Sequence, residues 1–356
     1  MTKKLLKHTT PLCFLPNGNL IAYSKGSVII IDKDDRIVKK IRIQRGWAEL
    51  LFSNFKPISR LLRIGLRASI AISDNVILFS RGNSLYELDL IDGIVSSGFY
   101  LGRGIRPLNF TKIEGIKGFE DGVVFGGYLM NFKKEPVSIY KRYSRDKWKI
   151  VFTFEDGAIN HIHNIIPDRF RNCIWVLTGD FGEASAIWKI SNDFSKVEKV
   201  LSNKQMYRSC ACFPIKEGLL YATDAPFANN FIYLLDNSLN VSPISELLGS
   251  CIYACQVDNQ FVFSTTVEPD GRDNTIINLL SRKKRGAGIK DSYAHIYVGN
   301  LDKGFIEVYK EKKDLWPYLF QFGAFRFPCG DNKTRILYFQ PIATNMHDLD
   351  LLSMKL

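Results

Sequence analysis

Short apolar runs separated by turn residues recur along the whole chain, and a helical period of about 3.6 residues is nearly absent. The runs are rich in Val, Ile, Phe and Tyr and are bounded by Gly, Asn and Asp, which is the pattern of β-strands joined by tight turns. The pattern therefore predicts an all-β fold. The predicted strands are Asn19–Ser24, Ser27–Asp32, Arg36–Ile43, Asn75–Ser80, Ser84–Leu90, Val123–Gly127, Val137–Tyr143, Lys149–Phe154, Cys173–Thr178, Ala186–Ile190, Leu219–Thr223, Phe231–Leu235, Phe261–Thr265 and Arg335–Gln340.

These strands group into units about 40 residues apart, each opening with a polar turn and an apolar strand. Two units, Gly18–Asp32 and Asp74–Asp89, share the order turn, apolar strand, Ser-basic-Gly hairpin, apolar strand, Asp. A repeat of this size is typical of a β-propeller, so we predict one all-β propeller domain over residues 1–356. Seven blades fit best, six or eight remain compatible, and a double β-sandwich is the alternative fold. The seven turns are Pro16–Gly18, Ser73–Asn75, Glu120–Gly122, Arg171–Asn172, Lys216–Gly218, Asp258–Asn259 and Gly330–Asn332.

Two segments depart from the strand pattern. Residues 46–66 place Trp47, Leu50 and Leu51 at helix-like spacing, so we expect a short helical or irregular insertion there. Residues 281–291 contain the basic run Arg282–Arg285 close to glycines, which is typical of an exposed loop.

The formal net charge of +12 favours an anionic partner, which could be nucleic acid, a membrane surface or an acidic polysaccharide. Most of the excess is spread along the chain, so the run Arg282–Arg285 is interpreted as a solvated loop and nucleic acid as the less favoured partner. No apolar run approaches the length of a membrane-spanning helix, and the beginning of the chain lacks the apolar core of a signal peptide. We expect a cytoplasmic protein, with peripheral membrane contact left open.

Seven cysteines lie mostly in apolar strand-like runs, and an odd number argues against a disulfide framework. We therefore expect free thiols. Two pairs imitate zinc ligands, but strict alternation would place Cys210 and Cys212 on one strand face as small apolar side chains. Neither this pair nor Cys251 and Cys255 has the Cys-x2-Cys spacing of a zinc knuckle, so no zinc site is expected at either.

The densest polar cluster contains His161 and His163. In an extended strand both would project to one face, where they could share a ligand or a metal, or serve as hydrogen-bonded structural residues. Asp180 and Glu183 follow the predicted strand Cys173–Thr178 in a glycine-containing turn. Paired carboxylates suit acid-base chemistry on sugars, although the turn itself also accounts for them.

A second polar set lies at corresponding positions of the next unit and contains Tyr207, Arg208 and Asp224. An arginine there could bind a carboxylate through two hydrogen bonds, or form a structural salt bridge. Further binding candidates at like positions are Arg67, Arg106, Tyr128 and Gln321.

Part of the chain resembles a family of bacterial propellers with sialidase-like or Asp-box repeats, whose genes often accompany those for surface polysaccharide synthesis. The chain departs from that family, because Ser144–Trp148 is a shortened, glycine-free Asp-box and no sialidase arginine triad can be mapped. The resemblance implies a propeller acting in surface polysaccharide metabolism. It covers roughly Arg60 to Gln340 and rests on Gly126–Tyr128, Pro136–Tyr140, Trp148, Val151–Phe154, His161–His163, Ile174–Asp180, Tyr207–Arg208, Thr223–Pro226, Val267–Pro269 and Phe320–Gly323.

We expect a propeller that binds an anionic saccharide or saccharide precursor in bacterial surface polysaccharide metabolism and that could also cleave or modify it. Cleavage could be hydrolysis by the carboxylates, or elimination with His or Tyr as base and Arg or a metal neutralising a uronate. A non-catalytic scaffold for other proteins is the alternative, because propellers serve both uses. The sequence assigns no cofactor. The candidate catalytic residues are His161, His163, Asp180, Glu183 and Tyr207, and the candidate binding residues are Arg67, Arg106, Tyr128, Arg208, Asp224 and Gln321.

Overall fold

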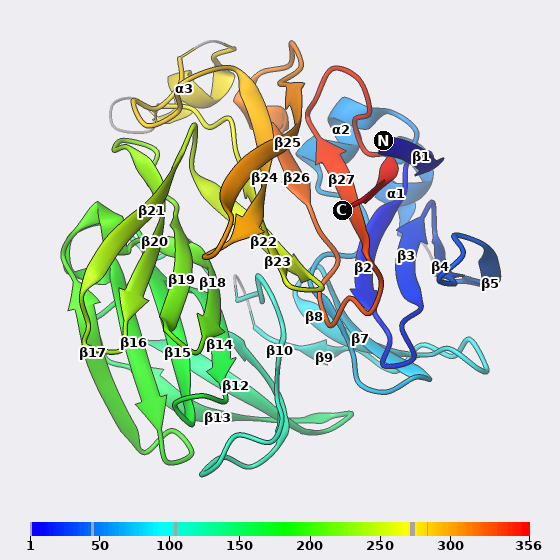
Figure 1. Cartoon of the computed structure of the whole chain (residues 1–356). Helices are drawn as coiled ribbons and strands as arrows, with labels where there is room; N and C mark the ends of the chain where they lie inside the picture. Colours follow the sequence, from blue (N-terminus) through cyan, green and yellow to red (C-terminus); the bar gives the residue numbers. More distant parts are fainter. Residues whose placement is uncertain (1, 44–45, 103–104, 271–274, 283) are drawn as a thin grey trace.

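The fold is a closed ring of seven four-stranded antiparallel sheets (Figure 1). The computed structural model describes residues 2–43, 46–102, 105–270, 275–282 and 284–356. The predicted all-β propeller with seven blades is confirmed, and the double β-sandwich is not the fold. Each of the seven predicted turns joins the first strand of a blade to its second strand.

The strands of each blade follow one another in sequence from the channel outwards. Blade 1 comprises β2 (Thr10–Phe14), β3 (Leu20–Ser24), β4 (Ser27–Ile31) and β5 (Ile37–Arg42); blade 2 comprises β6 (Ser69–Ala71), β7 (Val76–Arg81), β8 (Ser84–Asp89) and β9 (Phe99–Tyr100); blade 3 comprises β10 (Thr111–Ile113), β11 (Gly122–Gly126), β12 (Val137–Ser144) and β13 (Lys147–Phe154). Blade 4 comprises β14 (His161–Asp168), β15 (Cys173–Gly179), β16 (Ala186–Ser191) and β17 (Lys196–Ser202); blade 5 comprises β18 (Ser209–Ile215), β19 (Gly218–Thr223), β20 (Asn230–Asp236) and β21 (Val241–Leu247); blade 6 comprises β22 (Cys251–Val257), β23 (Gln260–Thr265), β24 (Tyr293–Asn300) and β25 (Gly304–Lys312).

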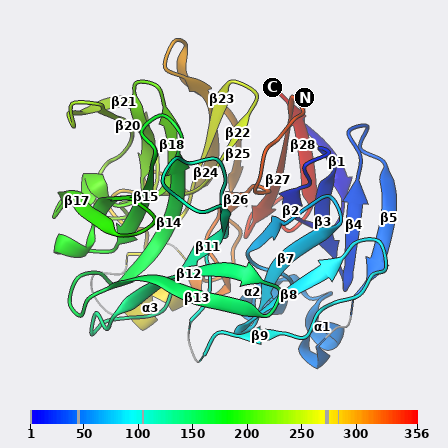
Figure 2. The same ribbon diagram turned by 90° about the horizontal axis from the view of Figure 1, so that it is seen from below.

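Blade 7 is assembled from both ends of the chain. It comprises β26 (Ala324–Arg326), β27 (Ile336–Ile342) and β28 (Leu351–Lys355), with β1 (Thr2–Leu6) paired antiparallel to β28 as the outermost strand. The two termini consequently lie side by side in both views (Figures 1 and 2). This pairing closes the ring, because the first and last segments of the chain belong to the same blade. It also covers the edge of β28, which would otherwise be exposed.

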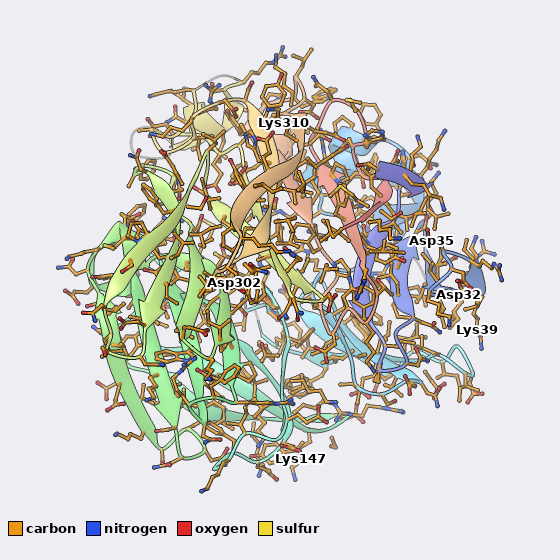
Figure 3. The ribbon with its side chains drawn as sticks, viewed as in Figure 1. Asp32, Asp35, Lys39, Lys147, Asp302 and Lys310 are labelled. Atoms are coloured by element: carbon orange, nitrogen blue, oxygen red, sulfur yellow. The ribbon has the colours of Figure 1, made fainter. Side chains whose placement is uncertain are left out.

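The apolar core lies between the blades. Each of the seven buried hydrophobic clusters joins residues of two neighbouring blades, so the ring is held by seven blade-to-blade contacts. The outermost strands carry exposed lysines such as Lys39, Lys147 and Lys310 (Figure 3). Charged side chains on edge strands discourage pairing with other chains.

Short helices occur in the connections. The connection between blades 1 and 2 contains α1 (Trp47–Phe52) and α2 (Lys56–Leu61), within the segment where an insertion was expected. The β23–β24 connection of blade 6 contains α3 (Thr275–Leu280), and the basic run follows it, with residue 283 outside the described residues. Three single turns are η1 (Gly182–Ala184), η2 (Gln205–Tyr207) and η3 (Tyr318–Phe320). Among the described residues, every helix is too short or too polar to cross a membrane.

The innermost strands β14 and β18 are each interrupted by a β-bulge near their beginning. The strand register shifts between Ile162 and Asn164, and again between Ser209 and Ala211. His163 and Cys210 are therefore the extra residues, without a partner on the neighbouring strand. A bulge redirects a side chain that strict alternation would send elsewhere.

Candidate functional site

A polar cluster forms where the innermost strands begin and the second strands end. In an antiparallel pair these two positions are opposite each other, as the pairs His161–Gly179, Ser209–Thr223 and Cys251–Thr265 show. In each blade, the residues that follow the second strand therefore lie at the same end of the channel as the first residues of the innermost strand. Blades 4, 5 and 6 each place an acidic residue there, namely Asp180, Asp224 and Glu268.

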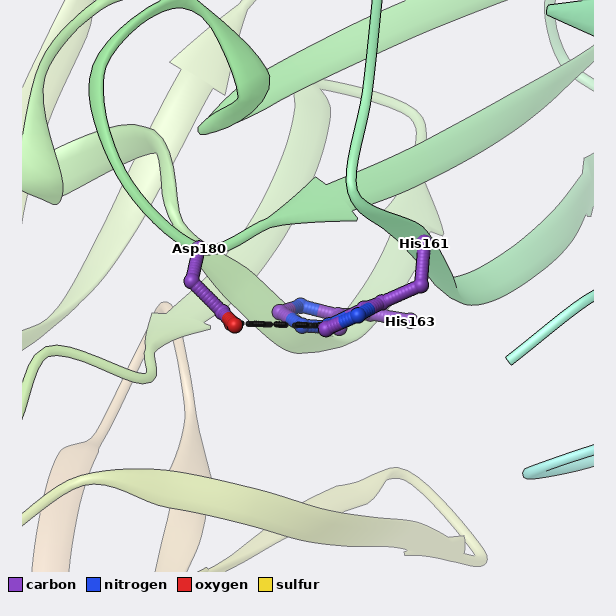
Figure 4. Close-up of side chains that lie close together, drawn as sticks. All are labelled: His161, His163 and Asp180. Carbon is purple, nitrogen blue, oxygen red and sulfur yellow. Dashed lines mark hydrogen bonds and ion pairs between the residues drawn. The ribbon is translucent and has the colours of Figure 1, made fainter. Parts of the chain in front are cut away.

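His161, His163 and Asp180 converge on one point (Figure 4). The two Nε2 atoms are 3.0 Å apart, and Asp180 Oδ1 lies 3.5 Å from the first and 3.4 Å from the second. Both imidazoles are buried, whereas the Asp180 side chain keeps 31% of its surface exposed. The trio therefore faces the solvent through its carboxylate.

Two local features fix the orientation of His163. Its Nδ1 lies 3.0 Å from the carbonyl oxygen of Ser209 in the neighbouring blade, and a carbonyl only accepts, so Nδ1 is the donor. The imidazole also lies directly over Gly179, where a Cβ atom would overlap the ring. Glycine at this position leaves the space that the ring occupies.

Arg208 connects the trio to the carboxylate of blade 5. Its guanidinium donates to Asp224 Oδ2 through Nε at 3.2 Å and through a terminal nitrogen at 3.1 Å, and that terminal nitrogen lies 3.2 Å from Asp180 Oδ1. Burial alone would raise the pKa of Asp180, but His161, His163 and Arg208 together hold this pKa well below its usual range. The two aspartates raise the pKa of Arg208 although its burial acts against it.

Cys210 completes this side of the cluster. Its thiol donates to Asp224 Oδ2 over 3.5 Å. Burial, followed by the charge of Asp224, raises the pKa of Cys210 well above its usual value, so the group is a neutral thiol. The bulge at Cys210 corrects the expectation that Cys210 and Cys212 share a face: Cys212 packs into the apolar core between blades 4 and 5. All seven cysteines are unpaired.

Glu268 is the third acidic residue and was not among the candidates from the sequence. It is buried and accepts a hydrogen bond from the Thr266 hydroxyl. Burial, and next the charge of Asp224, raises the pKa of Glu268 to about 7. A signal was present, because Asp180, Asp224 and Glu268 follow one another at equal intervals along the chain. Glu268 is the acidic group of the cluster that can exchange a proton near neutral pH.

Tyr128 and several arginines form the other side of the channel mouth. The Tyr128 ring packs on His161 with 4.4 Å between centroids, and the Arg106 guanidinium carbon lies 5.6 Å from the Tyr128 centroid. Burial, followed by the charge of Asp180, raises the pKa of Tyr128 to about 12. Burial, followed by the positive charge of Arg106, lowers the pKa of Arg67 to about 10, with Arg63 and Arg326 contributing.

Three candidates from the sequence do not join this cluster. Glu183 turns outwards, accepting a hydrogen bond from Ser202 at 3.0 Å and lying 3.5 Å from Lys199 on the outermost strand. Tyr207 lies beside Lys204, and the amide of Gln321 donates to the backbone of Arg60. The structure thus brings together His161, His163, Asp180, Arg208 and Asp224. Tyr128 packs against His161, Arg106 lies on the other side of Tyr128, and Arg67 lies within electrostatic reach of Arg106.

Two sets of side chains among the described residues could hold a metal ion. They are His161, His163 and Asp180, and His163, Cys210 and Asp224, with the ligating atoms of each set within 4.8 Å of one another. The second set is less suited, because its carboxylate is bonded to Arg208 and its thiol is held neutral.

Comparison with known proteins gives the fold and no closer relationship. No family model and no curated protein matches the sequence. An oligogalacturonate lyase in complex with manganese superimposes with a TM-score of 0.60 at 12% identity, over 100% of this chain and 93% of that one. The Cps50 (Swd1) β-propeller domain of Myceliophteria thermophila gives 0.57 at 11% identity, and the AfRom2 CNH domain 0.54 at 8%, each over 100% of this chain and 99% of the other. At such identities the likeness is one of propeller architecture.

Proposed function

We propose that this end of the channel binds an acidic saccharide, with Arg67 and Arg106 contacting its carboxylates. The observation that carries the proposal is a group of arginines with no carboxylate partner among the described residues. Arg67 and Arg106 are both partly buried, and each lies within electrostatic reach of further arginines. Like charges held together without counter-charge form a site for an anion.

Other buried arginines of the chain are neutralised internally. Arg60 lies 2.6 Å from Asp314 and 3.1 Å from Asp348, and Arg208 is paired with two aspartates. Arg208 was expected to bind the ligand, but its charge is already balanced. The binding role therefore passes to Arg67 and Arg106, whose planar guanidinium groups match a carboxylate.

Tyr128 extends the argument from binding to the class of ligand. Its ring lies between Arg106 and His161, and it is half-buried, so it offers a partly apolar surface beside the cations. Sugar rings combine carboxylates or hydroxyls with apolar faces, which suits such a surface better than a simple anion would need. The oligogalacturonate lyase shares the fold, and its name refers to an acidic saccharide.

If the ligand is cleaved, proton abstraction next to a uronate carboxylate suits this site better than hydrolysis. Hydrolysis requires two opposed carboxyl groups, but Glu183 turns away from Asp180, and both Asp180 and Asp224 are paired with Arg208. Elimination requires cationic groups that neutralise the carboxylate and a neighbouring base; Arg67 and Arg106 could supply the cations, and His161 the base when no ion is bound to its Nε2.

Titration calorimetry tests the proposal with acidic oligogalacturonides, neutral oligosaccharides of matched length, and single-stranded nucleic acid. We expect the acidic saccharide to bind best, and Arg67→Gln and Arg106→Gln each to weaken binding by about tenfold or more. Arg42→Gln is the matched control, because it removes the same charge from the exposed outermost strand of blade 1.

Two results would contradict the proposal. If nucleic acid bound more strongly than any saccharide, and if both arginine variants bound it like the parent, the binding site would be assigned to the basic run after α3. Absence of binding to every saccharide would leave the propeller as a scaffold for proteins. Cleavage is followed separately through the ultraviolet absorbance of an unsaturated uronate.

A further inference from the structure

We infer that His161, His163 and Asp180 form a binding site for one divalent transition-metal ion. The inference rests on the geometry of these three side chains and does not depend on the saccharide proposal. His161 and His163 come from the beginning of β14, and Asp180 from the turn after β15 (Figure 4).

The hydrogen bonding of His163 is the first argument. Because Nδ1 donates to the carbonyl oxygen of Ser209, Nε2 of the neutral imidazole carries a lone pair. A histidine whose Nδ1–H is bound to a backbone carbonyl while Nε2 faces a cluster has the arrangement of most metal-ligating histidines. The protein therefore holds His163 in the tautomer and orientation that a metal requires.

The surroundings of that lone pair are the second argument. It faces Asp180 Oδ1 at 3.4 Å, and a carboxylate oxygen is also an acceptor. His161 Nε2 is 3.0 Å away and can donate its one proton to only one of them at a time, while Arg208 lies 3.2 Å from the same Asp180 Oδ1. A cation placed among the three atoms would satisfy all of them at once.

The distances are the third argument. The edges of the triangle formed by the three atoms measure 3.0, 3.4 and 3.5 Å. A point equidistant from the atoms lies about 1.9 Å from each, so an ion slightly out of their plane would make three bonds of about 2.1 Å. These are ordinary lengths for nitrogen and carboxylate ligands, and binding would need little movement.

The type of ion follows from the donors and from the charge. Two imidazoles and one carboxylate suit Zn²⁺, Mn²⁺, Fe²⁺ or Co²⁺, whereas Mg²⁺ and Ca²⁺ prefer oxygen ligands. Asp180 and Asp224 carry two negative charges against the one of Arg208, so the cluster is short of positive charge before an ion arrives. Three protein ligands with an exposed carboxylate leave coordination positions open toward the channel mouth.

Calorimetry on the full-length, metal-stripped protein tests the inference with Zn²⁺ and with Co²⁺, whose visible absorption reports its ligands. We expect one ion per chain at this site, and we expect His161→Gln, His163→Gln and Asp180→Asn each to weaken binding by about a hundredfold or more. Thermal unfolding of each variant confirms that the propeller is intact.

His295→Gln is the matched control. His295 is also buried on a strand and contacts two carboxylates, Glu307 through Nδ1 at 2.6 Å and Asp291 through Nε2 at 3.1 Å. Its two contacts lie on opposite sides of the ring, so one ion cannot bridge all three groups, and this variant should bind the metal like the parent. Cys210→Ser should do the same, because the thiol is not a ligand in the preferred set.

The inference is overturned if no ion binds, or if binding persists unchanged in all three ligand variants. Loss of binding in Cys210→Ser with retention in His161→Gln would assign the ion to the set His163, Cys210 and Asp224 and would also refute it. Arg67→Gln and Arg106→Gln should still bind one ion per chain in the absence of saccharide, whereas the three ligand variants should not, so failure of this inference and failure of the saccharide proposal give different results.

Discussion

Replacing Arg208 by Met removes the cation at the centre of the cluster while filling most of its space. Arg208 is 9% exposed, and it bonds Asp224 at 3.1 and 3.2 Å and Asp180 at 3.2 Å. Loss of one partner of a buried ion pair costs about 3–5 kcal/mol, because the remaining charge is left uncompensated. Here two carboxylates lose their shared partner, so we expect the free energy of unfolding to fall by an amount at the upper end of that range.

The loss should depend on pH in a defined direction. In the native protein the pKa of Asp180 is depressed, so its contribution to stability is present above the pKa of an unfolded aspartate and is lost in acid. Without Arg208 the pKa of Asp180 should be less depressed, because only His161 and His163 still lower it, so the folded variant takes up a proton at a higher pH than the parent does. The variant should therefore be most destabilised at about pH 7 and come closer to the parent at about pH 4, where the unfolded aspartate begins to bind a proton.

Urea unfolding followed by tryptophan fluorescence and circular dichroism measures this difference, with EDTA present so that no metal ion contributes. Arg42→Met serves as the control for loss of an exposed arginine, and it should change stability by less than about 0.5 kcal/mol. In the double variant Arg208→Met/Asp224→Asn, part of the stability should return. A loss below about 1 kcal/mol that is equal at both pH values would show that the pairs contribute little.

Three further outcomes are expected. Gly179→Ala should displace the His163 imidazole by steric overlap and weaken Zn²⁺ binding in calorimetry, whereas unchanged binding would contradict the close packing at Gly179. Because burial raises the pKa of Glu268 to about 7, its contribution to stability should be lost as the pH rises from the unfolded value toward about 7, and Glu268→Gln should flatten the dependence measured by urea unfolding between about pH 5 and 7. Thiol titration under denaturing, non-reducing conditions should count all seven cysteines, and a deficit of two would indicate a disulfide.

The sequence predicted the number of blades because the turn between the first and second strand keeps its polar character in every blade. The strands that it identified are second, third and outermost strands, and the second strands are buried almost throughout, so they stand out as continuous apolar runs between turns. The innermost strands β14 and β18 were not among the predicted strands. They border the channel and contain bulges, and both features interrupt the apolar pattern. A bulge adds one residue locally, and no residue type in the sequence marks it without ambiguity.

Within the site, the sequence predicted which segments of the chain meet better than it predicted where individual side chains point. His161, His163, Asp180, Arg208 and Asp224 meet because the ends of paired strands are opposite each other, which the strand order dictates. Glu183, only three residues beyond Asp180, points to the outermost strand, because it lies within the single helical turn η1. Tyr207 and Gln321 likewise lie in short helical turns or directly after one, where a change in one dihedral angle redirects the side chain.

The ring separates charge across the channel mouth. Blades 4, 5 and 6 place Asp180, Asp224 and Glu268 on one side, while Arg67 and Arg106, next to blades 2 and 3, occupy the other. Tyr128 contacts His161 and Arg106 and so connects the two sides. An ion bound to the histidines and a carboxylate bound to the arginines would lie on either side of one aromatic ring. Opposite charges on the two sides of one ring favour each other's binding. The ion must then raise the affinity for the carboxylate by the same factor as the carboxylate raises the affinity for the ion. If both proposals hold, calorimetry with the acidic oligogalacturonide should give tighter binding when Zn²⁺ is present, and Zn²⁺ should bind tighter by the same factor when the saccharide is present.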